Sequence, residues 1–181
     1  MGDAPVVMAL RLSGAAVDRQ IGVAYADSTQ QSLGLCEFAD DDQFANLEAI
    51  TVQLGAKECV MGSESSVEAT KVKDVLQRCG VAVTTRKRSE FSATTLKQDL
   101  SRLVAPGSTQ DDYADMPNAQ AALGALIRYL ELLSDETNHH HFNVTRFDLA
   151  THMRLDAAAV RALNLMPSPN DRIQMLRIVH C

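Results

Sequence analysis

The sequence predicts an α/β fold with a mixed sheet and flanking helices. Short apolar runs separated by polar turns come first, segments with helical spacing follow, and brief strand-like runs lie between those segments. The 181 residues have the size of one domain with a short extension. Hydrophobic residues make up 46% of the chain, aromatic residues 4%, and tryptophan is absent, so we expect a largely aliphatic core.

The first three expected strands lie close together along the chain. Val6–Ser13 is an apolar run that ends at a Ser-Gly turn signal. Gln20–Asp27 alternates between apolar and smaller residues, and Ser32–Phe38 follows after a polar turn. Because the connections are short and polar, these runs favour an antiparallel meander.

The periodicity then changes to that of helices with intervening strands. Asp41–Leu54 has apolar residues at helical spacing and acids in its first turn, where they suit the helix dipole. Glu58–Met61 is a short strand, and Val67–Cys79 is a second helix that Gly80 would end. Val81–Thr85 contains a Val-Ala-Val run, which suits a strand covered on both faces.

This order of elements is typical of ribonuclease H-like folds, in which strands added to an antiparallel meander pack between helices. A third helix is expected at about Ala93–Val104. Ala105–Asn118 contains Pro-Gly and three aspartates, which indicates a loop or a partly disordered insertion. Ala119–Ser134 has the strongest helical pattern, and His141–Leu149 is expected to be a final strand.

Charge and cysteine usage indicate a protein of a reducing compartment that binds DNA weakly at most. The formal net charge is −6, whereas affinity for phosphate comes mainly from Lys and Arg. Cys36, Cys59, Cys79 and Cys181 form no CxxC pair, and the first two lie in apolar strands as small hydrophobes. No secretory leader pattern or run of bilayer length is present, so we expect an intracellular, soluble chain without membrane contact.

Catalysis is not indicated, although the fold raises a nuclease alternative. A metal-dependent nuclease of the ribonuclease H-like type needs several carboxylates around two metal ions, one of them on the first strand. The first strand here carries no acid, and Asp27, Glu48 and Asp99 do not form the required set by position. A phosphate-binding GxxxxGK[ST] loop and a GxSxG motif are also missing from the sequence.

The sequence contains three triplets of consecutive residues that are all acidic, all histidine or all basic. Asp40–Asp42 would suit a metal, but the strand-to-helix junction favours a capping role. His139–His141 would be a solvated loop, or a site of adventitious metal binding, because adjacent side chains do not converge on one ion. Arg86, Lys87 and Arg88 would contact a DNA backbone or an acidic partner, or would form an ordinary solvated strand end.

Eight collinear segments of the sequence form a distinctive set. They are IGVAYADS (21–28), LGLCEF (33–38), DDQFANLEAI (41–50), GAKECVM (55–61), TTRKRSEFS (84–92), LKQDLSRLV (96–104), AALGALIRYLELLSD (121–135) and FNVTRFDLATHMRLDAAAVRALNL (142–165). Together these segments resemble the connector domain of the MutS family of DNA mismatch-repair proteins. The likeness is greatest to the eukaryotic branch shared by both mismatch-recognition heterodimers.

The resemblance implies a division of the chain and a role for one helix. Residues 1–153 would be the connector, 154–166 the start of the lever and core domain, and 167–181 a divergent tail. In the family the connector relays movement between the mismatch-binding and ATPase domains. In bacterial members it also docks the repair factor MutL through the helix that matches 96–104, where Gln-Gln stands in place of Gln98 and Asp99.

The residue pattern agrees with such a docking helix. Leu96, Leu100 and Leu103 would be buried, which leaves Gln98, Asp99 and Arg102 on the other face, either for a partner or simply for solvent. The resemblance further implies a non-enzymatic chain in a nuclear protein with a second MutS homologue as heterodimer partner. Full-length members bind ATP and Mg, but this chain would hold no cofactor.

A third possibility is a fragment that does not fold stably without its neighbours. Its exposed apolar side chains would be Leu163, Leu165, Met166, Leu176 and Ile178.

Overall fold

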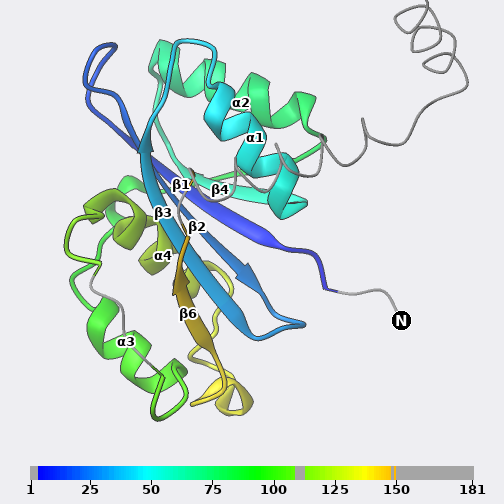
Figure 1. The fold of residues 1–181 in the computed structure, drawn as a ribbon, viewed down its shortest axis with the longest axis vertical. Helices are drawn as coiled ribbons and strands as arrows, with labels where there is room; N and C mark the ends of the chain where they lie inside the picture. Colours follow the sequence, from blue (N-terminus) through cyan, green and yellow to red (C-terminus); the bar gives the residue numbers. More distant parts are fainter. Residues whose placement is uncertain (1–3, 109–112, 148, 150–181) are drawn as a thin grey trace, which may run out of the picture. The chain divides into compact units, whose positions relative to one another are not determined.

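A computed structural model describes residues 4–108, 113–147 and 149 (Figure 1). The six strands of its sheet are β1 (Val7–Ser13), β2 (Gln20–Asp27), β3 (Ser32–Ala39), β4 (Glu58–Gly62), β5 (Ala82–Arg86) and β6 (Asn143–Arg146). The helices are α1 (Ala45–Leu54), α2 (Val67–Arg78), α3 (Leu96–Leu103) and α4 (Pro117–Tyr129), with 3₁₀ turns η1 (Arg88–Glu90) and η2 (Glu136–Asn138).

The sheet is mixed and has the strand order β5-β4-β1-β2-β3-β6. β1, β2 and β3 form the predicted antiparallel meander, with Ala24 of β2 opposite Ala9 on one side and Leu35 on the other. β4 and β5 extend it in parallel from β1, and β6 adds in parallel to β3. The α/β fold with a mixed sheet and flanking helices is thus confirmed, while the ribonuclease H-like label stays a prediction.

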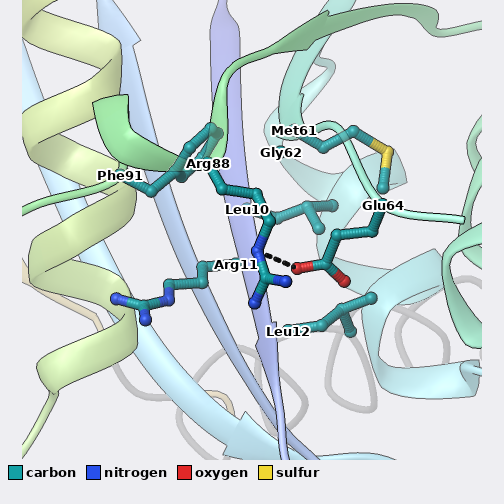
Figure 2. A pocket seen from close by; sticks show the side chains of 8 residues that line it. All are labelled: Leu10, Arg11, Leu12, Met61, Gly62, Glu64, Arg88 and Phe91. Carbon is teal, nitrogen blue, oxygen red and sulfur yellow. Dashed lines mark ion pairs between the residues drawn. The ribbon is translucent and has the colours of Figure 1, made fainter. Parts of the chain in front are cut away.

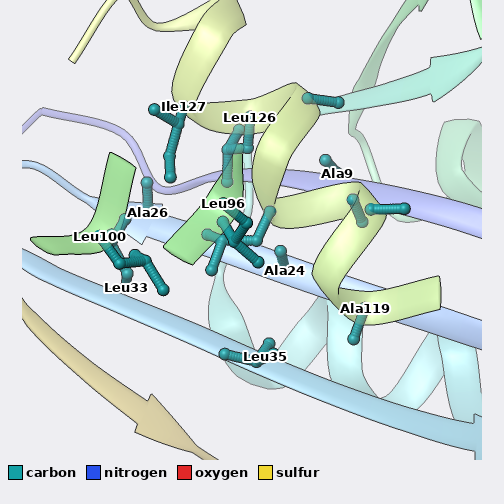
Figure 3. Close-up of a cluster of buried hydrophobic side chains, with 14 of the residues drawn as sticks. Ala9, Ala24, Ala26, Leu33, Leu35, Leu96, Leu100, Ala119, Leu126 and Ile127 are labelled. Atoms are coloured by element: carbon teal, nitrogen blue, oxygen red, sulfur yellow. The ribbon is translucent and has the colours of Figure 1, made fainter. Parts of the chain in front are cut away.

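Helices cover both faces of the sheet: α1 and α2 lie on one side, and α3 and α4 on the other (Figure 1). On the α4 side the strands present small residues, including Ala9, Ala24 and Ala26, so α4 packs close to the backbone (Figure 3). A Cβ added to Gly22 of β2 would lie 2.1 Å from the backbone nitrogen of Ala119 in α4. The absence of a side chain at Gly22 is therefore what lets α4 sit on the meander.

The start of α1 differs from the prediction, although the predicted capping is confirmed. Asp40 Oδ2 accepts a hydrogen bond from the Leu47 amide at 2.8 Å, and Asp41 Oδ1 accepts one from the Ala45 amide at 3.2 Å. Phe44 is fully buried in a left-handed conformation with φ 55°. The helix begins at Ala45 rather than Asp41, because the acids fold back onto the first turn instead of joining it.

Other element ends shift for local reasons. Pro117, predicted to lie in a loop, is the first residue of α4, a position where its missing N–H costs nothing. This helix ends at Tyr129 rather than Ser134. The start of α3 is Leu96, three residues later than predicted. Gly80 ends α2 with φ 75°, as predicted.

The prediction that the fifth strand is covered on both faces is wrong. β5 lies at the edge of the sheet, its Ala82 and Thr85 are exposed, and Val83 is only half-buried. Its apolar run therefore reflects β propensity rather than burial.

Some predictions concern residues outside the described ranges. Residues 109–112 of the expected insertion, the expected lever start at 154–166 and the tail at 167–181 belong to this group. None of the helices in the described ranges has the length and apolarity that a bilayer span requires.

Candidate interaction surfaces on α3 and beside β5

The first candidate surface is the solvent side of α3. Leu96, Leu100 and Leu103 are buried in one cluster with side chains of α4 and the sheet, which confirms the predicted inner face. Figure 3 shows Leu96 and Leu100 in this cluster. Gln98 and Arg102 are exposed on the other side. Neither side chain forms a hydrogen bond or an ion pair with another described residue. The structure therefore leaves both groups available to a partner.

Asp99, the third predicted docking residue, is held differently. It is half-buried and accepts a hydrogen bond from the Thr95 hydroxyl at 2.9 Å. Thr95 in turn accepts one from Arg128 Nη2 of α4 at 3.0 Å. Asp99 thus anchors the first turn of α3 and presents less of its carboxylate than a docking residue would.

Arg128 also holds the loop that leads into α3. Its Nη1 donates to the carbonyl oxygens of Glu90, at 2.6 Å, and of Ser92, at 3.4 Å. A Cβ at Gly124 would lie 2.3 Å from the Ser92 oxygen, so α4 and this loop are in backbone contact. Both apolar packing and hydrogen bonds therefore join α3 and its preceding loop to α4.

The second candidate surface contains the basic triplet at the end of β5. All three side chains are exposed, but two have acidic partners. Arg86 Nε lies 2.9 Å from Glu90 Oε2, and Arg88 Nε lies 3.3 Å from Glu64 Oε1. Lys87 forms no ion pair within the described part of the chain. Pairing removes much of the positive field that a DNA-backbone site needs.

Next to the triplet is a polar cluster that no local sequence pattern predicts. The Tyr129 hydroxyl donates to Glu58 Oε1, which also accepts from the Thr84 hydroxyl at 2.7 Å. The hydrogen bond to Glu58 raises the pKa of Tyr129. The guanidinium of Arg86 lies 5.7 Å from the centre of the Tyr129 ring. The cluster ties the edge strand to the end of α4.

A small cleft lies at the carboxyl ends of β1 and β4 (Figure 2). Its walls are largely apolar, and the Arg88–Glu64 pair closes one side. Arg11 of β1 is exposed and points away from Glu64. The lining residues are Leu10, Arg11, Leu12, Met61, Gly62, Glu64, Arg88 and Phe91.

The acids considered for a nuclease do not gather in this cleft. Asp27 accepts a hydrogen bond from the Gln30 amide in the β2–β3 turn. Glu48 Oε2 on α1 lies 4.0 Å from Arg78 Nη2. Asp99 belongs to α3, and α1 and α3 cover opposite faces of the sheet (Figure 1). Within the described ranges no three His, Cys, Asp or Glu side chains are placed to share a metal ion.

The other singled-out residues have structural partners. Asp42 Oδ1 lies 3.2 Å from Arg19 Nη1. The guanidinium of Arg19 also stacks on the Phe44 ring, and Arg19 is only 4% exposed. One ring nitrogen of His139 and one of His140 each lie within 3.3 Å of a backbone carbonyl oxygen. These two side chains are therefore more constrained than those of the solvated loop that the sequence predicts.

The buried cysteines behave as predicted. Cys36 and Cys59 are buried without a disulfide, and burial raises the pKa of Cys59.

Comparison with known proteins decides the family. Residues 5–143, most of the chain, match the family model for MutS domain II. The chain belongs to the MutS family. The matched domain is the connector, and its bounds include β1 to β5 entirely and β6 only at its first residue, Asn143. The resemblance inferred from the sequence phrases is therefore confirmed.

MutS-type relatives are similar over nearly the whole chain. DNA mismatch repair protein MSH2 of Arabidopsis thaliana is 45% identical over 94% of this chain. The msh-2 protein of Neurospora crassa is 39% identical over 93%, and MSH2 of Saccharomyces cerevisiae is 37% identical over 81%. The matches cover 19%, 19% and 16% of those proteins. The chain thus spans about a fifth of the length of its curated relatives.

Proposed function

We propose that this chain is a non-enzymatic connector domain that relays movement between the mismatch-binding and ATPase domains of a MutS-type protein. It also offers the solvent face of α3 to a MutL-type repair factor. In the full-length protein a second MutS homologue is the heterodimer partner, the ATPase part binds ATP and Mg, and the location is the nucleus. The relatives' names state DNA mismatch repair, which supports the process.

The observation that carries the docking proposal is the two-sided character of α3. Its leucines are locked in the core, while Gln98 and Arg102 have no partner among the described residues. Because α3 is already held rigidly, binding of a partner costs little conformational entropy in this helix. Arg and Gln provide donors and an acceptor that suit a polar, specific contact.

The relay proposal rests on how firmly α3 is joined to the sheet. Arg128 holds the loop that precedes α3, and Gly124 of α4 contacts the backbone of this loop at Ser92. Gly22 of β2 brings α4 into backbone contact with the meander. Close-packed elements move as a unit rather than deforming continuously. A displacement applied to α3 is thus expected to reach the sheet.

The cleft supports the proposal that the domain lacks catalytic activity. The first strand carries Arg11 at the cleft, where a two-metal nuclease would need a carboxylate. Contact with DNA is expected to be weak, since Arg86 and Arg88 are already paired with acids.

Equilibrium binding to the N-terminal domain of a MutL-type partner tests the docking proposal. The double variant Gln98→Ala/Arg102→Glu should lower the affinity at least about tenfold, because it removes two polar contacts and reverses a charge. Gln77→Ala/Lys71→Glu on the exposed face of α2 is the matched control and should bind like the wild type. All three chains must unfold cooperatively, which also rules out the unstable-fragment alternative.

Equal affinity of both double variants would contradict docking through α3. A well-folded wild-type chain that fails to bind would leave the relay role without a docking role.

A further inference from the structure

The outer edge of β5 carries backbone groups that no described residue satisfies through the sheet. The Ala82 amide donates to Lys57 at 2.9 Å, and the Arg86 carbonyl accepts from Ser63 at 2.8 Å, so these residues face β4. Along a strand the backbone groups alternate in direction. The N–H and C=O groups of Val83 and Thr85 therefore point outward, away from the sheet.

The surroundings of this edge fit an added strand. β5 is terminal in the strand order, and none of its residues is fully buried. A shallow hollow lies at its carboxyl end, lined by Thr85, Arg86, Lys87 and Glu90. An extended peptide paired with Val83 and Thr85 would continue into this hollow.

The charge at the hollow selects an acidic peptide. Lys87 is exposed and has no ion-pair partner in the described ranges, whereas Glu90 is already engaged by Arg86. The chain as a whole has a net charge of −6, so this end of β5 is a local positive surface on an acidic protein. A DNA duplex would meet one unpaired cation and would leave the free backbone groups unused.

We infer that the β5 edge binds an extended acidic segment of a partner protein by strand addition. The segment donates and accepts backbone hydrogen bonds at Val83 and Thr85 and places a carboxylate against Lys87. Backbone pairing supplies affinity in this type of recognition, and side chains supply specificity. This surface is distinct from the α3 face, so the two proposals can fail separately.

The test uses the 181-residue chain and a capped peptide of alternating valine and glutamate, with a valine–lysine peptide as comparison. Amide hydrogen exchange is followed by NMR. We expect the glutamate peptide to slow exchange at Val83 and Thr85 by about tenfold or more when bound, with little change at Ala82 and Thr84. The alternation is specific to pairing at the outer edge.

Two variants separate backbone pairing from charge. Lys87→Glu should weaken binding of the glutamate peptide about fivefold, whereas Lys71→Glu on α2 should not. Thr85→Pro removes an outward N–H and should abolish binding. If Thr85→Pro does not fold, the exchange pattern of the wild-type chain decides.

Three results would overturn the inference: no binding at millimolar peptide, equal binding of both peptides, or binding without slower exchange at Val83 and Thr85. A DNA duplex that shifts the Lys87 signals while the glutamate peptide does not bind would assign the hollow to nucleic acid instead.

Discussion

The carboxylate of Glu37, in β3, caps the first turn of α4 through Asn118. One oxygen accepts from the backbone amides of Asn118 and Ala119 at 2.8 and 3.1 Å, and the other accepts from the Asn118 side chain at 2.8 Å. Asn118 is 8% exposed and also donates to Ser13 in β1 at 2.8 Å. A residue of the sheet thus supplies the capping group that Met116, at the N-cap position, lacks.

Replacing Glu37 with alanine should lower the free energy of unfolding by about 2–3 kcal/mol, since buried donors at the start of α4 lose their acceptor. Denaturant unfolding measures this change. Glu136→Ala, at an exposed position, is the control and should stay within about 0.5 kcal/mol of the wild type. A Glu37→Ala chain as stable as the control would show that water replaces the carboxylate.

Gly22→Ala should destabilise the fold by about 2 kcal/mol or more, because the new methyl group would overlap the backbone of Asn118 and Ala119. Gly107→Ala is the comparison: its φ of 85° is strained for alanine, but no atom lies within 4 Å of the added Cβ. That variant should lose about 1 kcal/mol. A smaller loss at Gly22 than at Gly107 would contradict the close approach of α4.

The sequence predicted the elements better than their environments. Gln20–Asp27 was predicted with the observed bounds, because a strand between two polar turns is a local pattern. The start of α1 was missed because Phe44 adopts a left-handed conformation that its residue type rarely favours. Whether β5 is covered depends on the strand order, which no local pattern contains.

The candidate site was predictable only in part for the same reason. The exposed and buried faces of α3 follow from leucine spacing, so Gln98 and Arg102 were placed correctly. The engagement of Asp99 depends on Arg128, which is 29 residues away in the sequence and reaches it through Thr95. Tertiary partners of this kind leave no periodic signal.

Arg128→Ala should loosen α3 more than the rest of the domain. The loop carbonyls and Thr95 would lose their donor, so amide exchange in α3 should speed up about tenfold, while amides of β2 change little. Exchange measured residue by residue provides the readout. Arg78→Ala on α2 removes only an exposed 4.0 Å ion pair and is the control. Uniform acceleration across the domain would mean that Arg128 stabilises the fold generally rather than this joint.

The ion pair between Asp115 and Arg146 should make stability depend on pH in acid. Two hydrogen bonds from Arg146, at 2.7 and 2.6 Å, lower the pKa of Asp115 below its ordinary value of 3.8. A carboxyl group whose pKa is lower in the folded state than in the unfolded state stabilises the fold at pH values above its unfolded-state pKa. This stabilisation is lost as the pH falls through the folded-state pKa. The melting temperature of Asp115→Asn should therefore lie below that of the wild type at pH 6 and approach it as the pH falls through the lowered pKa of Asp115. A gap that is constant with pH would exclude this origin.

Photo-crosslinking from α3 is the sharpest test of docking through this helix. A benzophenone side chain is placed at Gln98 in one chain and at Gln77 of α2 in another, and each is irradiated with the N-terminal domain of a MutL-type partner. We expect a covalent adduct from position 98 and none from position 77. Adduct from position 77 alone, or equal adduct from both positions, would contradict docking through α3.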